Sequence, residues 1–439
     1  MHTFLVVWAG QLVSVTGTTL SGFALQVWVY LETGSVTRLA LVSLAFALPA
    51  VLLSPLAGVV ADRIDRRLAM LAADLVAGAA TLVIALLHFA GALEVWHLYL
   101  LIGFGAVGNT LQTPAWMAAV SLLVPKKHLG RANGLVMTSD AVSVVVAPAA
   151  AGALLATLGL GAVLLADLAT FVVAIATLAL VRFPRAERVG AGPKPSVLGE
   201  IRAGWRYLRE RRGLLGLLFI YAECNFALSM ANVLILPLIV SFAPETAAGA
   251  VFSAAGFGML AGSLAVSAWG GPKRKRIAWI MGGIAAGGVA VVAAGWRQSL
   301  VVIGGGYLAL SLLSPLINTS SQVVWQLKIA PGMQGRVFSL RRMLAQAATP
   351  LAMVLAGPLA DGVFEPLLAD GGGLAGSVGR VIGTGPGRGI AFLIILAGLS
   401  TIAAAAVGWA HPRIRFLEAE IPDQLPDAPA APASGEAPA

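Results

Sequence analysis

The chain has 439 residues, of which 58% are apolar and 11% are charged. Soluble globular proteins average about 45–50% apolar and about 25% charged residues. So apolar a composition leaves too few polar groups to cover a water-exposed surface. It excludes a soluble enzyme, a disordered protein and a disulfide-stabilised secreted scaffold.

Twelve apolar stretches follow one another, each long enough for a helix that crosses a hydrocarbon core about 30 Å thick. They are residues 5–30, 37–61, 68–90, 96–119, 134–157, 160–181, 214–240, 248–269, 276–295, 299–321, 337–361 and 389–410. None shows the strict alternation of an outer-membrane barrel strand. We therefore predict an all-α membrane protein with twelve transmembrane helices.

The longest polar stretch lies between the sixth and seventh predicted spans. It predicts an N-terminal six-helix bundle over 1–181, a cytoplasmic linker with an amphipathic helix over 182–212, and a C-terminal six-helix bundle over 213–410. Residues 411–439, rich in Pro, Ala and acids towards the end of the chain, are predicted to form a disordered cytoplasmic tail.

Basic residues predict the orientation in the membrane. The formal net charge is +9, and 25 of the 29 Lys and Arg residues fall on the side of the linker and the C-terminus. Cytoplasmic loops carry such an excess, so both termini are predicted to be cytoplasmic. The asymmetry accounts for the positive charge without a nucleic-acid partner.

The two halves carry the same landmarks in the same order. This parallel duplication predicts two bundles related by pseudo-twofold symmetry, with a substrate cavity between them at the membrane midplane. The matching landmarks are Leu56-Ala57-Gly58 with Leu260-Ala261-Gly262, Gly130-Arg131 with Gly335-Arg336, and Pro148 and Gly152 with Pro350 and Gly357.

The sharpest local pattern follows the second span. Gly58 permits close helix packing, and Asp62 with Arg63, Arg66 and Arg67 can form an ionic network in a tight cytoplasmic turn. An ordinary solvated loop with a positive-inside charge is the alternative interpretation.

This stretch resembles the loop signature G-x-x-x-D-R-x-x-R-R of the major facilitator superfamily, in the drug:proton antiporter branch that contains macrolide-efflux proteins and the enterobactin exporter. Further similar stretches are Leu129-Gly130-Arg131-Ala132-Asn133-Gly134-Leu135 and Gly335-Arg336-Val337-Phe338-Ser339. The resemblance implies a conformational latch of Gly58, Asp62, Arg63, Arg66, Arg67, Arg131 and Arg336, in which Asp62 contacts the start of the eleventh span.

Pro148 and Gly152 in the fifth span resemble a weakened form of the family's antiporter motif, with alanine at several glycine positions. The alternative is common packing of small residues between helices. The fourth span lacks the arginine that many superfamily antiporters carry there, so the usual arginine-mediated coupling is not expected.

Acids inside the hydrocarbon region are costly, and they are therefore the candidates for proton coupling. They are Glu223, Asp140 and Asp167, although each could instead be a hydrogen-bonded structural acid. Polar and aromatic candidates for the lining of the cavity are Gln26, Asn109, Gln112, Asn225, Phe226 and Asn318.

The resemblance implies a secondary active transporter of the prokaryotic inner membrane that exports hydrophobic or amphipathic small molecules by proton antiport with alternating access. Uptake or lipid movement by symport or facilitated diffusion is the alternative. No catalytic, metal-binding or nucleotide motif appears in the sequence, so we expect no enzyme activity and no cofactor or metal. The expected partners are a small-molecule substrate, protons and the lipid bilayer, and the chain is expected to be monomeric.

Overall fold

The computed structural model of the chain describes residues 2–63, 65–125, 128–181 and 197–424. Its described residues form helices and no strands, as predicted. The N-terminal half contains α1 (His2–Thr33), α2 (Val36–Arg63), α3 (Arg66–Phe89), α4 (Val95–Leu123) and α5 (Leu129–Leu180). The C-terminal half contains α7 (Arg212–Val240), α8 (Glu245–Trp269), α9 (Arg276–Trp296), α10 (Leu300–Lys328), α11 (Pro331–Leu359) and α14 (Arg388–Ala410).

The long helix α5 contains two of the predicted spans. Its backbone breaks at Gly159, with φ 78° and ψ 177°, a conformation that residues with a side chain rarely adopt. The predicted spans 134–157 and 160–181 meet at this residue. Ten helices of the described chain are long and apolar enough to cross a membrane. With α4 added and α5 counted twice, all twelve predicted spans are helical.

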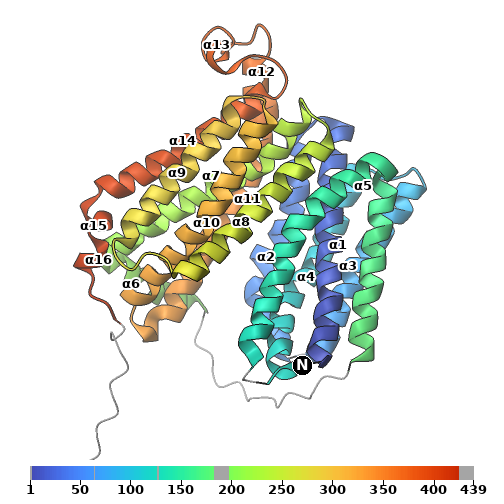
Figure 1. Cartoon of the computed structure of the whole chain (residues 1–439), viewed down its shortest axis with the longest axis horizontal. Coiled ribbons are helices and arrows are strands. Elements are labelled where there is room, and N and C mark those ends of the chain that lie inside the picture. Colours follow the sequence, from blue (N-terminus) through green and yellow to red (C-terminus); the bar gives the residue numbers. More distant parts are fainter. Residues whose placement is uncertain (1, 64, 126–127, 182–196, 425–439) are drawn as a thin grey trace, which may run out of the picture.

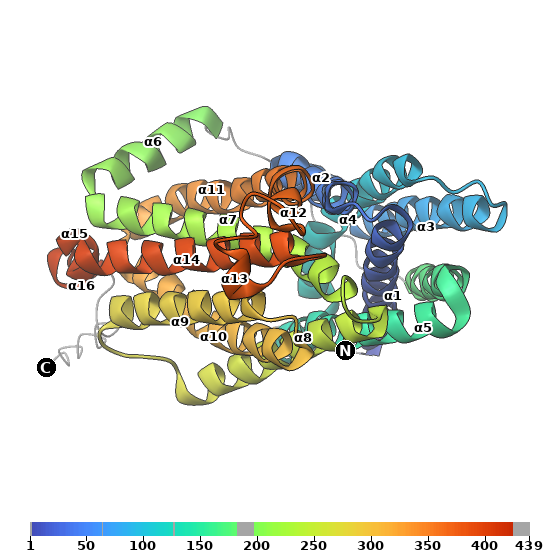
Figure 2. The same cartoon turned by 90° about the horizontal axis from the view of Figure 1, so that it is seen from above.

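The helices form two groups, α1–α5 and α7–α14 (Figure 1). The groups contact each other mainly through two helix pairs, α2 with α11 and α5 with α8, which Figure 2 shows on opposite sides of the contact region. The second span corresponds to the eighth in the duplicated sequence, and the fifth to the eleventh. A twofold rotation therefore exchanges the two pairs, as the predicted pseudo-symmetry requires.

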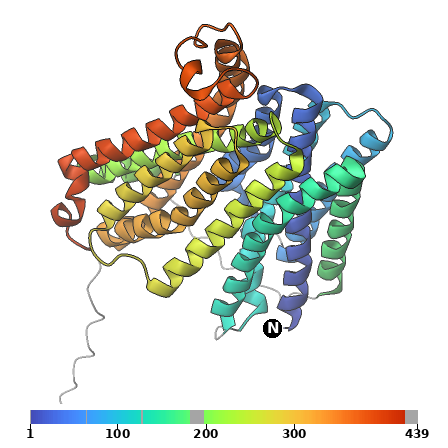
Figure 3. The same cartoon turned by 45° about the horizontal axis from the view of Figure 1, so that its top comes forward.

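Each end of the molecule has its own set of turns. We call the end that carries the N-terminus and the α2–α3 turn the connector face, and the opposite end the far face. The α1–α2 and α7–α8 turns lie at the far face. So does the segment after α11, which contains a π-helix (Ala360–Phe364), α12 (Glu365–Leu368) and α13 (Gly379–Ile382). Figure 3 shows this segment above the C-terminal group, next to the far ends of α1 and α2.

The amphipathic helix predicted within the linker corresponds to α6 (Val197–Glu210). It ends two residues before the predicted end of the linker at Arg212, because Arg211 leaves the helical conformation and α7 begins directly after it. Gly204 of α6 packs against the backbone of Arg336, where an added Cβ would lie 3.1 Å from the carbonyl oxygen. Residues 182–196 lie outside the described residues.

The predicted disorder of 411–439 is wrong for its first part. Helices α15 (Pro412–Arg415) and α16 (Leu417–Glu420) fold back onto the C-terminal group, and Leu417 is fully buried. The buried ammonium group of Lys328 holds this segment by donating to the carbonyl oxygens of Glu418, at 2.7 Å, and Ile421, and by pairing with Asp423 at 2.8 Å. The Pro- and Ala-rich composition concealed these anchors. Residues 425–439 lie outside the described residues.

Candidate functional site

At the far face, α5 and α8 approach each other through small residues. A Cβ added to Gly152 would lie 3.2 Å from the Cα of Thr246, and one added to Gly256 would lie 2.9 Å from the carbonyl oxygen of Val144. Gly249 lies directly against the carbonyl of Pro148. The two candidates of the antiporter-like motif, Pro148 and Gly152, therefore lie at the contact between the two helix groups.

One hydrogen bond crosses this contact. The amide of Ala149 in α5 donates to Oγ of Ser253 in α8 at 3.0 Å. Gly152, Gly249 and Gly256 allow this approach, because a glycine places no side chain between the two helix backbones.

The second far-face contact joins α2 to the end of α11. Asp361 of the π-helix accepts hydrogen bonds from Oγ of Ser35 at 2.8 Å, from the amide of Val36 at 3.0 Å and from the amide of Thr37 at 2.8 Å. These amides are the free donors at the start of α2. An acid of the C-terminal group thus caps a helix of the N-terminal group.

Two features shape the surroundings of Asp361. Gly357, one turn earlier, packs directly against the backbone of Thr37. A hollow of about 370 Å³ lies beside this contact, and its lining includes Tyr30, Asp361 and Glu365. Glu365 caps the start of α14 in the same way, by accepting from the amides of Gly387 at 3.2 Å and Ile390 at 2.9 Å.

Towards the connector face the two groups of helices diverge (Figure 1). Asp140, Val144, Pro148 and Gly152 are spaced four residues apart in α5, so they share one face of the helix. The last three contact α8. Asp140 lies one turn nearer the connector face, where its side chain is exposed. This proton-coupling candidate therefore lies on the face of α5 that is turned to the other group.

Among the latch candidates whose side chains the structure describes, Arg67, Arg131 and Arg336 do not form one cluster. Gly58, Asp62 and Arg63 lie in the last turns of α2, and their side chains lie outside what the structure describes. Asp65, which was not among the predicted latch residues, caps α3 by accepting from the amides of Arg67 at 3.0 Å and Leu68 at 3.1 Å.

The remaining basic residues of the predicted latch differ in their surroundings. The guanidinium of Arg67 donates to the carbonyl oxygens of Leu178 at 2.8 Å and Ala179 at 2.6 Å, and so binds the end of α5 within its own group. Arg131 is exposed. Arg336 contacts Sδ of Met333 at 3.7 Å. It lies near the start of α11, about 35 Å along the helix from its far end.

Asp167 is fully buried inside the N-terminal group. Its carboxylate accepts from Oγ of Ser21 in α1 at 2.6 Å, from Oγ1 of Thr81 in α3 at 3.3 Å and from Oγ1 of Thr170 at 3.4 Å. A hydroxyl can donate or accept. This cluster can therefore satisfy the acid with or without its proton.

A second buried acid, Asp74 of α3, lies about 10 Å nearer the connector face, seven residues before Thr81. It is 1% exposed. Gln112 donates to it at 2.7 Å and Gln11 at 3.2 Å, and Gln112 also donates to the side-chain oxygen of Gln11 at 2.9 Å. Gln112, a candidate for the cavity lining, therefore belongs to a polar cluster among α1, α3 and α4.

Glu223 lies 11 residues after Arg212, the first residue of α7, which corresponds to a depth of about 16 Å along the helix. Its Oε2 is buried and has no hydrogen-bond partner among the described residues. A buried acceptor without a partner costs about 1–3 kcal/mol, and more when it is charged.

The other candidates for the cavity lining are distributed over both groups of helices. Gln26 bonds to Ser43 at 3.3 Å and Asn225 to the carbonyl of Tyr221 at 2.8 Å, while Phe226 packs against the buried core. Asn109 and Asn318 are exposed. Among the described residues, no group of three or more His, Cys, Asp or Glu side chains could hold a metal ion.

Sequence reasoning missed Asp361 and gave Asp74 no role. Asp361 falls at the predicted end of the eleventh span and looked like an ordinary loop acid. Its spacing of four residues from Gly357 and Glu365 was a usable signal, because these three positions share a helix face. The partner across the contact, however, lies more than 300 residues away in the chain.

Comparisons with known proteins agree with this architecture. The family model described as Major Facilitator Superfamily matches residues 7–353. Macrolide efflux protein A of Streptococcus pyogenes is 29% identical over 364 residues, which cover 82% of this chain and 89% of that protein. The multidrug efflux pump Tap of Mycolicibacterium fortuitum is 27% identical over 357 residues, which cover 76% of this chain and 83% of the pump.

Solved transporter structures share the fold. A bacterial homologue of the human lysosomal transporter Spinster, in an inward-facing and unoccupied conformation, has a TM-score of 0.70 at 17% identity and covers 95% of this chain and 96% of its own. A bacterial homologue of the iron transporter ferroportin, in an inward-facing state, has a TM-score of 0.63 at 18% identity. The match covers 92% of this chain and 99% of the homologue.

Proposed function

We propose that this chain, which belongs to the Major Facilitator Superfamily, exports hydrophobic or amphipathic small molecules in exchange for protons. The similarity to macrolide and multidrug efflux proteins over most of the chain supports drug efflux. The substrates of this protein would be of the same class, which includes macrolides and other apolar drugs. Their route would pass between the two groups of helices.

The contacts between the helix groups support alternating access. Both inter-group pairs meet at the far face, through the glycines of α5 and α8 and through the cap that Asp361 places on α2. The groups diverge at the other end (Figure 1). Rocking of one group against the other would open the far face and close the connector face. The excess of basic residues supports a cytoplasmic connector face and cytoplasmic termini.

Proton coupling rests mainly on Glu223. Its buried Oε2 has no hydrogen-bond partner among the described residues, at mid-depth in α7. This buried acceptor within an apolar span makes Glu223 the first candidate for the residue that carries the coupled proton. Asp167, with its hydroxyl partners, and the exposed Asp140 are the further candidates.

Transport in inside-out membrane vesicles tests this function. Vesicles acidified on the inside should accumulate the macrolide erythromycin and the cationic dye ethidium, and dissipation of the pH gradient should abolish the accumulation. Uptake or facilitated diffusion predicts no accumulation driven by an inward-acid gradient, so this outcome would overturn the proposed direction of transport.

Glu223→Gln tests the proton site, because it keeps the size of the side chain and removes the titrating group. Proton-driven accumulation should be lost, while downhill exchange of erythromycin is retained. Glu32→Gln is the matched control, because Glu32 is an exposed acid at the far end of α1. Unchanged proton-driven accumulation by Glu223→Gln would remove this residue from the coupling mechanism.

A further inference from the structure

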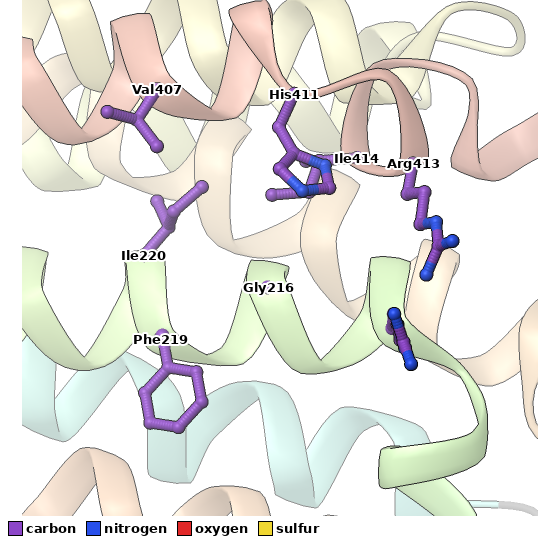
Figure 4. Close-up of a pocket in the computed structure, with 8 residues that line it drawn as sticks. Gly216, Phe219, Ile220, Val407, His411, Arg413 and Ile414 are labelled. Atoms are coloured by element: carbon purple, nitrogen blue, oxygen red, sulfur yellow. The ribbon is translucent and has the colours of Figure 1, made fainter.

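A groove lies at the connector face of the C-terminal group, between α7, α14 and α15. It has a volume of about 540 Å³, and its lining includes Gly216, Phe219, Ile220 and Val407 on the apolar side. Figure 4 shows Val407 and Ile220 facing each other at one end of the groove and His411 and Arg413 towards the other. The groove is thus apolar at one end and basic at the other.

The basic end carries three cationic or titratable groups from two segments. Arg212 begins α7, and His411 and Arg413 follow the end of α14. All three side chains are exposed. Among the described residues, neither Arg212 nor Arg413 has a side-chain ion pair or hydrogen bond, and nearby Glu210 is 3.7 Å from Arg211 instead. Two guanidinium groups are therefore free to bind an anion.

Tight backbone packing fixes the spacing of these groups. Gly213 of α7 lies directly against the carbonyl of Arg413, and a Cβ added to Gly216 would lie 2.6 Å from the side chain of Ile414. The segment after α14 is therefore held against the start of α7. The basic end does not depend on a flexible tail.

The groove lies at the connector-face ends of α7 and α14, two helices that are long and apolar enough to cross a membrane. The apolar side chains of Phe219 and Val407 are 55% and 60% exposed although both lie in helices that span the membrane. Trp409 is an exposed aromatic residue at the connector-face end of α14, and the guanidinium carbon of Arg415 lies 5.4 Å from the centre of its ring. Aromatic residues are enriched at the interface between membrane and water. Figure 1 places α14 and α15 on the side turned away from the N-terminal group.

We infer that this groove binds an anionic phospholipid. Its phosphate would lie between Arg212 and Arg413, beside His411, and one acyl chain would extend along Ile220 and Val407. Basic pockets between transmembrane helices on the cytoplasmic side bind anionic headgroups in this way. The inference relies on the proposed cytoplasmic orientation of the connector face, because the cytoplasmic leaflet carries the anionic lipids. It does not depend on proton coupling or on the identity of the transported substrate.

Native mass spectrometry of the purified full-length protein, titrated with phosphatidylglycerol or phosphatidylethanolamine, tests the site. We expect tighter binding of phosphatidylglycerol. The double variant Arg212→Gln/Arg413→Gln should weaken that binding about 30-fold, because each of the two basic residues near an anionic surface contributes about five- to sixfold. Both residues are exposed, so the variant should keep its helical circular dichroism.

Lys273→Gln/Arg274→Gln is the matched control. It removes the same charge from the connector face, at exposed positions outside the groove, and should leave binding within about twofold of the wild type. Equal weakening in this control would overturn the site, because a general surface charge would then explain the binding. Unchanged binding in the groove variant would overturn it as well.

A third arm distinguishes a lipid from a soluble anion. Glycerol 3-phosphate at tenfold excess should fail to displace phosphatidylglycerol, because it cannot occupy the apolar end. Val407→Trp should weaken phosphatidylglycerol binding while all three basic residues remain. Displacement by glycerol 3-phosphate, with no effect of Val407→Trp, would identify a soluble phosphate site and refute a lipid site. Each of these readouts is independent of transport, so a failed transport assay would not change them.

Discussion

Asp361 offers the clearest test of how the far face is held closed. The half-buried carboxylate satisfies one hydroxyl and two backbone amides of the other helix group, all at 2.8–3.0 Å. In the proposed transport cycle, opening of the far face would separate α2 from the π-helix and leave these donors to water. Asp361→Ala would then remove an interaction that exists in only one of the two proposed states.

The size of the effect follows from the geometry of the cap. An N-cap side chain contributes about 0.5–2 kcal/mol to its helix, and an acid at a helix N-terminus contributes a further about 0.3–1 kcal/mol. The closed far face should lose about 2 kcal/mol in Asp361→Ala, which shifts the equilibrium towards opening about 30-fold. Asp361→Asn keeps one acceptor oxygen and loses the charge. It should destabilise the closed far face by about 1 kcal/mol and shift the equilibrium towards opening about fivefold.

Double electron–electron resonance measures this equilibrium directly. Spin labels at Glu32→Cys and Gly376→Cys, both exposed at the far face, would report the separation of the two groups. The background is Cys224→Ala, because Cys224 is the chain's single cysteine. The population with the longer distance should increase from the wild type to Asp361→Asn and further to Asp361→Ala.

Asp370→Asn is the control, because Asp370 accepts from Thr384 at 2.6 Å within the same far-face segment and, in the described part of the chain, has no hydrogen bond to the other group. It should leave the distance distribution unchanged. If Asp361→Ala gave the wild-type distribution, the cap would have no role in holding the far face closed. The reasoning would also fail if Asp370→Asn produced the same shift.

Two further predictions concern close packing and the tail. Gly249→Ala places a methyl group against the carbonyl of Pro148, so it should destabilise the closed far face by about 1–3 kcal/mol. The distance between the spin labels at the far face should then lengthen. Gly282→Ala, with open space around the residue, should leave that distance unchanged. Lys328→Met removes the anchor of residues 418–423 and should make trypsin cleave after Arg415 at least tenfold faster; an unchanged cleavage rate would contradict the anchoring role.

The sequence predicted the architecture well because membrane insertion makes each span a local property. Length and hydropathy define a span without reference to its neighbours, and the repeated landmarks indicated which helices correspond. The Gly159 break was visible as a gap between two apolar stretches. Where local composition misled, as for residues 412–424, the missing information was a single buried lysine that contacts the tail from another helix.

The site was less predictable because its interactions join residues far apart in the sequence. Glu223 and Asp167 stood out as acids in apolar spans. Nothing in the sequence showed that Oε2 of Glu223 has no hydrogen-bond partner among the described residues, or that Asp167 accepts from three hydroxyl groups. Asp361 was missed for the opposite reason. Its sequence surroundings are ordinary, and only the packing of α11 on α2 turns it into a cap.

The two faces suggest how the states remain close in free energy. At the connector face Arg66 has a buried Nη1 without a hydrogen-bond partner among the described residues, and such a donor costs about 1–3 kcal/mol. Closure of that face would bring the start of α11 towards it and supply acceptors, while opening of the far face would remove the cap of Asp361, worth about 2 kcal/mol. The free energy gained when Arg66 finds acceptors at the connector face would therefore offset the free energy lost with the Asp361 cap at the far face. In the proposed antiport mechanism, one proton moving down a gradient of about 100 mV would supply about 2.3 kcal/mol, which would be enough to drive a cycle between two such states.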